Sequence, residues 1–338
     1  MDKKELLELE KINEMKAKNF SVFRAVATYL NNFPFLVSKE IMEEIGGGVA
    51  ENEEYAFAIF LANALSEDED EIEIFEREYF KRAVKMLDPK KYYENPFYKN
   101  IKIPTVKDGS WDLGYQHYEP YEGFIWDDII IDDNYREIPQ IGFFKEKFSF
   151  PTVFENGVEW MAIKPNEIET MKPHLEKMWG DVCVFGLGIG YFAYMASLKP
   201  EVKSVTIIEK DKSVISLFEK HILPQFENKD KIKIVLADAI DYAREQMANE
   251  HYDTAFVDLW HDVSDGVELY TRMKKAERIN KGVKFCYWIE KSLLSNIRWF
   301  VFENLYKGAK NGTWQGTLSE LKEYISFEYL REFYKFLL

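Results

Sequence analysis

Three glycines, Gly186, Gly188 and Gly190, stand between an apolar run and a helix-like run. The apolar run is DVCVF (181–185), and the helix-like run is YFAYMASLK (191–199). Glycine permits a sharp turn, and without a Cβ its backbone can approach a ligand beside the partly positive N-terminus of the following helix. The pattern therefore predicts a strand, a ligand-binding glycine loop and a helix.

Carboxylates follow the next apolar runs. Glu209 follows SVTII and comes 19 residues after Gly190, where a carboxylate can accept both hydroxyls of a ribose. The run IKIVLAD ends at Asp238 and is followed by Ala239. An acid there can accept a hydrogen bond from the exocyclic amine of adenine. The run YDTAFVD ends at Asp258, which adds a third carboxylate to the same set of strand ends.

The elements that must position these residues alternate between strand and helix from Asp181 to about Glu290. A helix from about Lys212 to His221 separates the second and third strands, and Val283–Trp288 supplies a fifth. This alternation predicts an α/β fold with a Rossmann-like doubly wound parallel sheet. In such a sheet the ligand lies outside the carboxyl ends of the strands, where the strand order reverses, so the loop and the acids should converge there.

From 181 to 290 the sequence resembles the class I S-adenosyl-L-methionine (SAM)-dependent methyltransferases, and most of all their spermidine-synthase-like branch. The resemblance rests on the glycine loop, the acid after the second strand and the Asp-Ala pair after the third. It implies SAM as the cofactor. The implied contacts are Gly186, Gly188 and Gly190 with the methionine part, Glu209 with the ribose, Asp238 and Ala239 with the adenine, and Asp258 with the methionine amine or the acceptor.

Three features depart from the family pattern. Val184 stands two residues before the first glycine, where the family usually has an acid that contacts the methionine amine. DLWHD (258–262) replaces an Asp-Ser-(Ser/Thr)-Asp-Pro pattern. Lys291 to Leu338 is helical in pattern, where the family normally adds an antiparallel hairpin. We therefore expect a helical C-terminal tail and a shortened or rearranged sheet.

A nicotinamide dinucleotide site is the main competing interpretation, because it shares the strand, the glycine loop and the acid about 20 residues later. Tyr191 occupies the position of the third glycine in that fingerprint, where its side chain would crowd the packing of helix against strand. Asp238 gains a role only with SAM. We therefore favour SAM and assign Tyr191 to the cofactor site, where its ring could cover the ligand; packing against the sheet is the alternative.

Asp258 and His261 are the candidate catalytic residues. In aminopropyltransferases, to which the resemblance extends, an aspartate in this region deprotonates the attacking amine. His261 is the only one of the five histidines expected near the crevice, and an imidazole titrates close to neutral pH. The alternatives are a solvated or helix-capping carboxylate for Asp258 and a surface histidine for His261. No histidine cluster has metal-ligand spacing, so no metal is expected.

The rest of the chain divides into a helical and an irregular part. Residues 4–87 carry apolar residues at helical spacing in about five segments. The following residues end in FSFPTVFENGVEWMAI (148–163), in which Asn156-Gly157 favours a tight hairpin turn. The predicted domains are a helical N-terminal domain at 1–90, an irregular β-rich connector at 91–165 and a SAM-binding domain with a helical extension at 166–338.

Composition limits the partners. The 338 residues are 46% hydrophobic and carry a formal net charge of −15, so we expect a globular protein that repels nucleic acid. The start of the chain lacks a signal-peptide core, and no run of about 18 apolar residues follows, which predicts a cytoplasmic protein without membrane contact. Cys183 and Cys286 lie in strand-like runs, as buried thiols do. The expected partners are a small-molecule substrate and, in a homodimer, a second copy.

These observations lead to one function and two alternatives. We expect a SAM-dependent methyltransferase that acts on a small-molecule acceptor. The enzymatic alternative is an aminopropyltransferase of the spermidine-synthase-like kind, which uses decarboxylated SAM. The alternative from another class is a SAM- or nucleotide-binding sensor or scaffold without catalysis, for which the missing loop acid and the altered DLWHD segment leave room.

Overall fold

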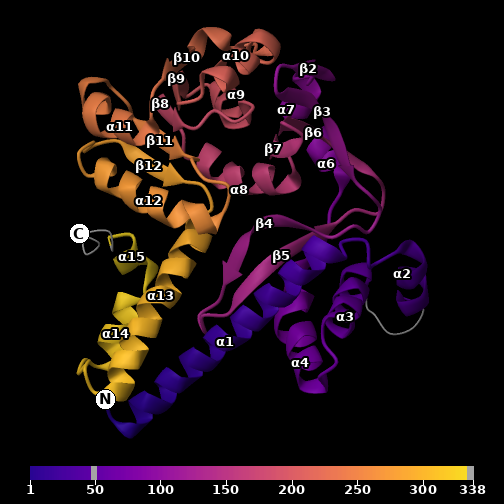
Figure 1. Ribbon diagram of the computed structural model, residues 1–338, viewed down its shortest axis with the longest axis vertical. Coiled ribbons are helices and arrows are strands. Elements are labelled where there is room, and N and C mark those ends of the chain that lie inside the picture. Colours follow the sequence, from indigo (N-terminus) through magenta and orange to yellow (C-terminus); the bar gives the residue numbers. More distant parts are fainter. Residues whose placement is uncertain (47–51, 333–338) are drawn as a thin grey trace. The chain divides into compact units, whose positions relative to one another are not determined.

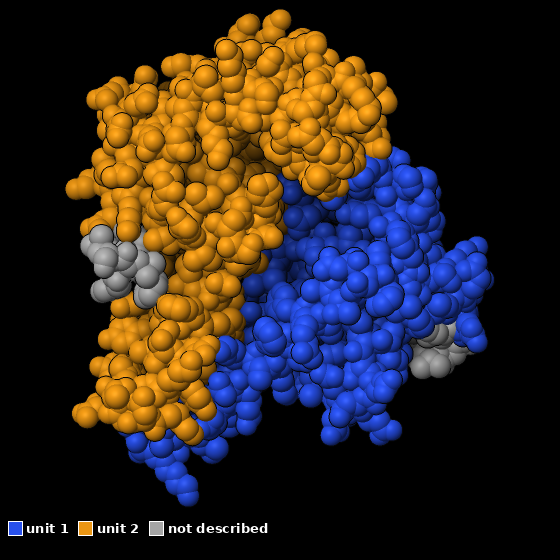
Figure 2. All heavy atoms as spheres, in the orientation of Figure 1, with its two compact units in different colours: residues 1–93, 116–150, 164–167 blue, residues 94–115, 151–163, 168–338 orange. Residues whose placement is uncertain are grey.

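The computed structural model describes residues 1–46 and 52–332. The chain forms two compact units, each built from segments that are separate in the sequence (Figure 2). Unit 1 contains Met1–Tyr93, Gln116–Phe150 and Lys164–Glu167, and unit 2 contains Glu94–Tyr115, Pro151–Ile163 and Ile168–Leu338. The three domain ranges expected from the sequence stay a prediction.

Most of unit 1 is helical (Figure 1). Its helices are α1 (Lys3–Asn32), α2 (Lys39–Gly46), α3 (Glu53–Leu65), α4 (Glu69–Glu73), a π-helical segment (Ile74–Phe80), α5 (Lys81–Ala83) and α6 (Pro89–Tyr93). Helix α1 begins at a capping box, in which the Asp2 carboxylate accepts the Glu5 N–H at 2.8 Å and the Glu5 carboxylate accepts the Asp2 N–H at 2.9 Å. These bonds satisfy N–H groups that the first helical turn leaves without partners.

Unit 1 also contains a three-stranded sheet with the order β1-β5-β4. Its strands are β1 (Val84–Met86), β4 (Phe124–Ile131) and β5 (Glu137–Phe143), with β1 parallel and β4 antiparallel to β5. The expected helical pattern up to Leu87 is therefore wrong at β1, because hydrogen bonding to the distant β5 overrides the local pattern. Unit 1 therefore combines helices with a sheet, and a separate, purely helical N-terminal domain stays a prediction.

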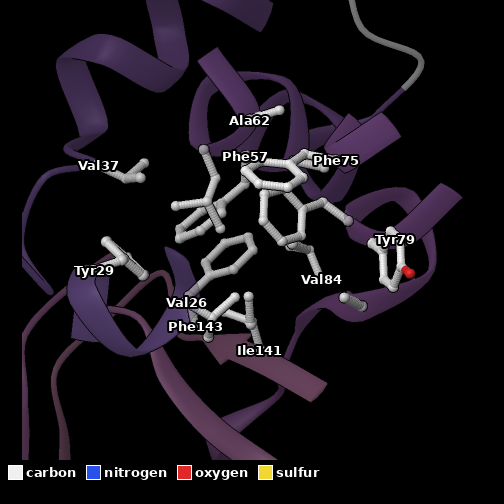
Figure 3. Packing of buried hydrophobic residues seen from close by; sticks show 14 of the residues in the cluster. Val26, Tyr29, Val37, Phe57, Ala62, Phe75, Tyr79, Val84, Ile141 and Phe143 are labelled. Carbon is white, nitrogen blue, oxygen red and sulfur yellow. The ribbon is translucent and has the colours of Figure 1, made fainter. Parts of the chain in front are cut away.

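The core of unit 1 packs against β5, all of whose residues are buried. Phe143 at its end stacks on Phe57 of α3, with ring centroids 4.6 Å apart and planes at 11°. Figure 3 shows these two rings among the side chains of Val26, Phe75 and Ile141. Because aromatic rings remove large apolar areas from water, this stack contributes to the stability of unit 1.

A second sheet has the order β2-β3-β6-β7. Its strands are β2 (Val106–Asp108), β3 (Trp111–Tyr118), β6 (Phe148–Glu155) and β7 (Val158–Ala162). Strands β6 and β7 pair in antiparallel fashion, and Asn156 (φ 50°) and Gly157 (φ 82°) between them have left-handed backbones, as a tight hairpin turn requires. The hairpin predicted from the sequence is confirmed.

Unit 2 contains a five-stranded sheet with the order β10-β9-β8-β11-β12, in which all neighbours are parallel. Its strands are β8 (Gly180–Phe185), β9 (Val202–Glu209), β10 (Ile232–Leu236), β11 (Thr254–Val257) and β12 (Lys284–Tyr287). The chain adds β9 and β10 on one side of β8 and then β11 and β12 on the other, as in doubly wound Rossmann-like sheets. The predicted parallel sheet is confirmed.

Helices precede, connect and follow these strands. They are α7 (Pro96–Asn100), α8 (Pro165–Leu175), α9 (Tyr191–Ser197), α10 (Lys212–His221), α11 (Ala239–Asp241) and α12 (Val263–Glu277), with shorter turns at Leu223–Gln225, Lys229–Lys231, Tyr242–Gln246 and Met247–Asn249. After β12 come α13 (Glu290–Asn311), α14 (Leu318–Tyr324) and α15 (Phe327–Leu330), and up to residue 332 no strand follows β12. The predicted helical tail is confirmed over these elements. None of the helices in 1–46 and 52–332 is both long and apolar enough to span a membrane.

Replacing Phe143 by Ala should lower the free energy of unfolding by about 3–5 kcal/mol, because the change removes a stacked ring and leaves a cavity. Urea unfolding followed by circular dichroism measures the loss. The matched control is Phe20→Ala, whose ring is 70% exposed and whose loss should stay within about 0.5 kcal/mol. Equal effects of the two substitutions would contradict the assigned core.

Candidate functional site

The loop after β8 carries the three glycines of the predicted site. Gly186, Gly188 and Gly190 have φ values of 98°, 52° and 82°, in the region that residues with a Cβ rarely adopt. Gly190 is the residue before α9, and its N–H donates to the Leu187 carbonyl at 2.9 Å. The tight turn from strand to helix therefore requires glycine for conformational reasons alone.

Protein atoms also lie close to each of these glycines. A Cβ on Gly186 would lie 2.0 Å from the Asp258 carbonyl oxygen, and one on Gly190 would lie 2.3 Å from the Phe218 ring. A Cβ on Gly188 would lie 2.4 Å from the Sδ of Met161 in β7. The sequence attributed the glycines to a sharp turn and to the approach of a ligand. In the structure, close packing within unit 2 excludes a side chain at Gly186 and Gly190, and at Gly188 the end of the Met161 side chain occupies the position.

Glu209, at the carboxyl end of β9, is half-buried beside this loop. Its Oε2 accepts the Leu187 N–H at 3.1 Å, and its Oε1 accepts the Asp211 N–H at 2.8 Å. The two bonds fix the carboxylate against the glycine loop. A carboxylate can accept about four hydrogen bonds, so each oxygen retains capacity for a ligand hydroxyl.

Asp238, after β10, is exposed and caps α11. Its Oδ1 accepts the N–H groups of Ile240 and Asp241, at 2.9 and 3.1 Å. Within the described part of the chain, its Oδ2 has no hydrogen-bond partner, so that oxygen can accept a ligand amine. Ala239, the next residue, is buried at the start of the helix.

Leu236 is a further candidate site residue, which the sequence did not suggest. It ends β10 directly opposite Glu209 in the parallel register, and its side chain is 55% exposed. At the edge where sheets of this type bind ligands, an exposed leucine can offer an apolar wall to a planar base. The apolar run IKIVLAD gave no sign of this exposure, because the open side of the edge strand β10 depends on the strand order.

Asp258 lies at the carboxyl end of β11, next to the glycine loop. Its N–H donates to the Phe185 carbonyl at 2.9 Å, and its carbonyl faces Gly186. Burial of the carboxyl group raises the pKa of Asp258 to about 7, because removing water disfavours the charged form. A carboxyl with that pKa can accept a proton near neutral pH.

The residues after Asp258 divide between core and surface. Trp260 is buried, and its ring packs against Gly266 of α12. The side chain of His261 is 79% exposed, and its Nδ1 lies 3.2 Å from the Asp265 carboxylate on the same helix. The structure thus brings Asp258 to the glycine loop and leaves His261 at the surface beside Asp265. The role of His261 as a base stays a prediction.

Tyr191 is buried at the start of α9. Its hydroxyl accepts a hydrogen bond from the Asn95 amide at 3.0 Å, and its ring meets Phe97 edge-on at 5.5 Å. These contacts fasten α9 to α7 and give the tyrosine a packing role. Its contact with a ligand stays a prediction.

One group of three side chains among the described residues could hold a metal ion: Asp181, His251 and Asp253. Asp181 is near the amino end of β8, and Asp253 directly precedes β11. This group therefore lies at the edge of the sheet opposite the glycine loop and contributes nothing to the candidate site.

Comparison with known proteins finds matches among solved structures. No family model matches the chain, and no curated protein matches it. Among solved structures, spermidine synthase from Thermotoga maritima matches with 17% identity and a TM-score of 0.30 over 46% of this chain. The chain spans 57% of the length of that enzyme. The assignment of the fold rests on the strand order of unit 2.

Gly186→Ala should destabilise the protein more than Gly282→Ala. Both positions have positive φ, 98° and 101°, but a Cβ on Gly282 meets nothing within 4 Å, so that change costs about 1–2 kcal/mol. A Cβ on Gly186 meets the backbone of Asp258, which adds about 1–3 kcal/mol of overpacking. Urea unfolding compares the two, and equal losses would show that the loop and the β11 end are not packed together.

Proposed function

We propose that this chain binds SAM at the carboxyl edge of the unit 2 sheet and transfers its methyl group to a small-molecule acceptor. One observation carries the proposal: the ends of β8, β9 and β11 meet at the glycine loop, and β10 ends beside β9. Glu209 bonds to Leu187 in the loop, and the Asp258 carbonyl faces Gly186. The point where strand order reverses is where sheets of this type bind ligands.

The side chains at this edge suit the parts of an adenosine. The two ribose hydroxyls would donate to Glu209, whose carboxylate is already held in place. The adenine amine would donate to Oδ2 of Asp238, with the ring beside Leu236 and Ala239. The methionine part would lie along Gly186, Gly188 and Gly190, with Tyr191 behind them.

A nicotinamide dinucleotide suits the same edge less well. Tyr191 takes the place of the third glycine in the dinucleotide fingerprint, and it is buried against Asn95 and Phe97. In the SAM arrangement, Oδ2 of Asp238 would accept a hydrogen bond from the exocyclic amine of adenine. The packing of Tyr191 supports SAM over the dinucleotide, whereas Asp238 could accept a hydrogen bond from the adenine amine of either ligand.

When bound, SAM would supply a methyl group activated by its sulfonium. The chain would then have to align the acceptor and receive its proton. The carboxylate of Asp258 is the first candidate for that proton, because burial raises its pKa to about 7. His261 is the second candidate, with its ring oriented by Asp265.

Aminopropyl transfer from decarboxylated SAM is a second candidate function. A base such as Asp258 suits an amine acceptor, which must lose a proton as it reacts. Incubation with SAM or decarboxylated SAM and a pool of amines, followed by mass spectrometry, distinguishes methylated from aminopropylated products. Tight binding without any product would indicate the sensor or scaffold.

Glu209→Ala should weaken SAM binding by about 1–3 kcal/mol, because the ribose hydroxyls lose their acceptor. Isothermal titration calorimetry measures the affinity, with NAD as the competing ligand. Glu219→Ala is the matched control, since Glu219 is an exposed glutamate on the neighbouring helix α10. The proposal fails if wild-type protein binds neither SAM nor S-adenosylhomocysteine, or if Glu209→Ala binds them as the wild type does.

The turnover rate should rise with pH up to about 7 and then level off, because the Asp258 carboxyl accepts a proton only when ionised and burial raises its pKa to about 7. Asp258→Asn should abolish this rise and lower turnover by about 10² or more. His261→Gln should preserve the rise. A profile that loses its pH dependence in His261→Gln and keeps it in Asp258→Asn would assign the base to the histidine.

A further inference from the structure

The β6–β7 hairpin places one side chain directly against the glycine loop. Met161 of β7 is partly exposed, and its Sδ and Cε lie 2.4 and 2.9 Å from the position that a Cβ on Gly188 would occupy. The thioether thus fills the space in front of the middle glycine. The sequence could not show this contact, because it joins the hairpin to a loop that comes after another strand.

The backbone that carries Met161 is held firmly. The Tyr98 hydroxyl donates to the Ile163 carbonyl at 2.5 Å, and the Asn156 N–H donates to the Ser110 carbonyl at 2.8 Å. Trp160 meets Trp111 edge-on at 5.2 Å. Because both ends of β7 are anchored within unit 2, the end of the Met161 side chain is the part that can move.

The three glycines differ in what covers them. Backbone covers Gly186, and the ring of Phe218, a buried residue, covers Gly190. Gly188 is covered by the terminus of an unbranched side chain with three rotatable bonds. Of the three, only Gly188 can therefore become accessible through a rotamer change.

We propose that Met161 is a specificity-determining residue, which disfavours adenosyl ligands with a long charged tail relative to those with a short apolar one. This inference rests on the proposed SAM site. A tail that extends from the ribose past Gly188 must displace the thioether and bring charged groups against apolar surface, whereas a short methylthio tail leaves Met161 in place.

The test compares SAM with 5′-methylthioadenosine, which has the same nucleoside and lacks the amino-acid tail. Calorimetry gives both affinities for the wild type, Met161→Ala and Met161→Leu. Met161→Ala should tighten SAM binding by roughly tenfold and change methylthioadenosine binding by less than about twofold. Met161→Leu keeps apolar bulk in front of Gly188 and should keep the wild-type preference.

Val158→Ala is the matched control, because Val158 lies on the same strand with its side chain 71% exposed. It should leave both affinities unchanged. Thermal melting checks that each variant folds, and Met161→Val provides a second shortened side chain, which a strand accommodates well.

An unchanged ratio of the two affinities in Met161→Ala and Met161→Val would overturn the role of Met161 and leave the SAM site intact. A SAM affinity that weakens in both variants would also overturn it, by showing that the thioether supports the tail. If no variant binds either compound, the proposed function fails and this inference fails with it.

Discussion

The parallel pairing of β8 with β11 is the interaction on which the candidate site depends. It places Phe185 beside Val257, so that β8 and β11 end at the same edge of the sheet. The Asp258 N–H then donates to the Phe185 carbonyl, and the Asp258 carbonyl approaches Gly186 too closely for any side chain. This pairing also forms the place where the strand order reverses. The β8–β11 pairing thus accounts both for the position at which sheets of this type bind ligands and for the requirement for glycine at position 186.

Two of the three acids at this edge also have a local structural role. Glu209 holds the glycine loop, and Asp238 caps α11 with one oxygen. Each carboxylate keeps hydrogen-bonding capacity that its structural role does not use. Asp258 differs, because no hydrogen bond to its side chain is found in the described residues and burial raises its pKa. A predominantly acidic edge suits neutral or cationic ligands.

Local sequence patterns predicted much of unit 2. Apolar runs followed by Glu209, Asp238 and Asp258 predicted the strands and their succession along the chain, and Asn156-Gly157 predicted the hairpin. These features depend on residues close together in the chain, for which periodicity and turn chemistry are sufficient. The contributions of the candidate site residues to ligand binding and catalysis stay predictions.

Contacts between distant segments could not be predicted in the same way. Strand β1 lies in a helical pattern and becomes a strand only through β5. The exposure of Leu236 depends on the position of β10 at the sheet edge, and the contact of Met161 with Gly188 depends on how the hairpin docks. The glycine loop was located correctly, but its close neighbours are protein atoms, which only the fold reveals.

The most direct test of the proposed site is a crystal structure of the protein with S-adenosylhomocysteine. The ribose hydroxyls should lie within hydrogen-bond distance of the Glu209 carboxylate, with the adenine amine on Oδ2 of Asp238 and the ring beside Leu236. A ligand bound away from the carboxyl edge of the sheet, or with its ribose turned from Glu209, would contradict the proposed site.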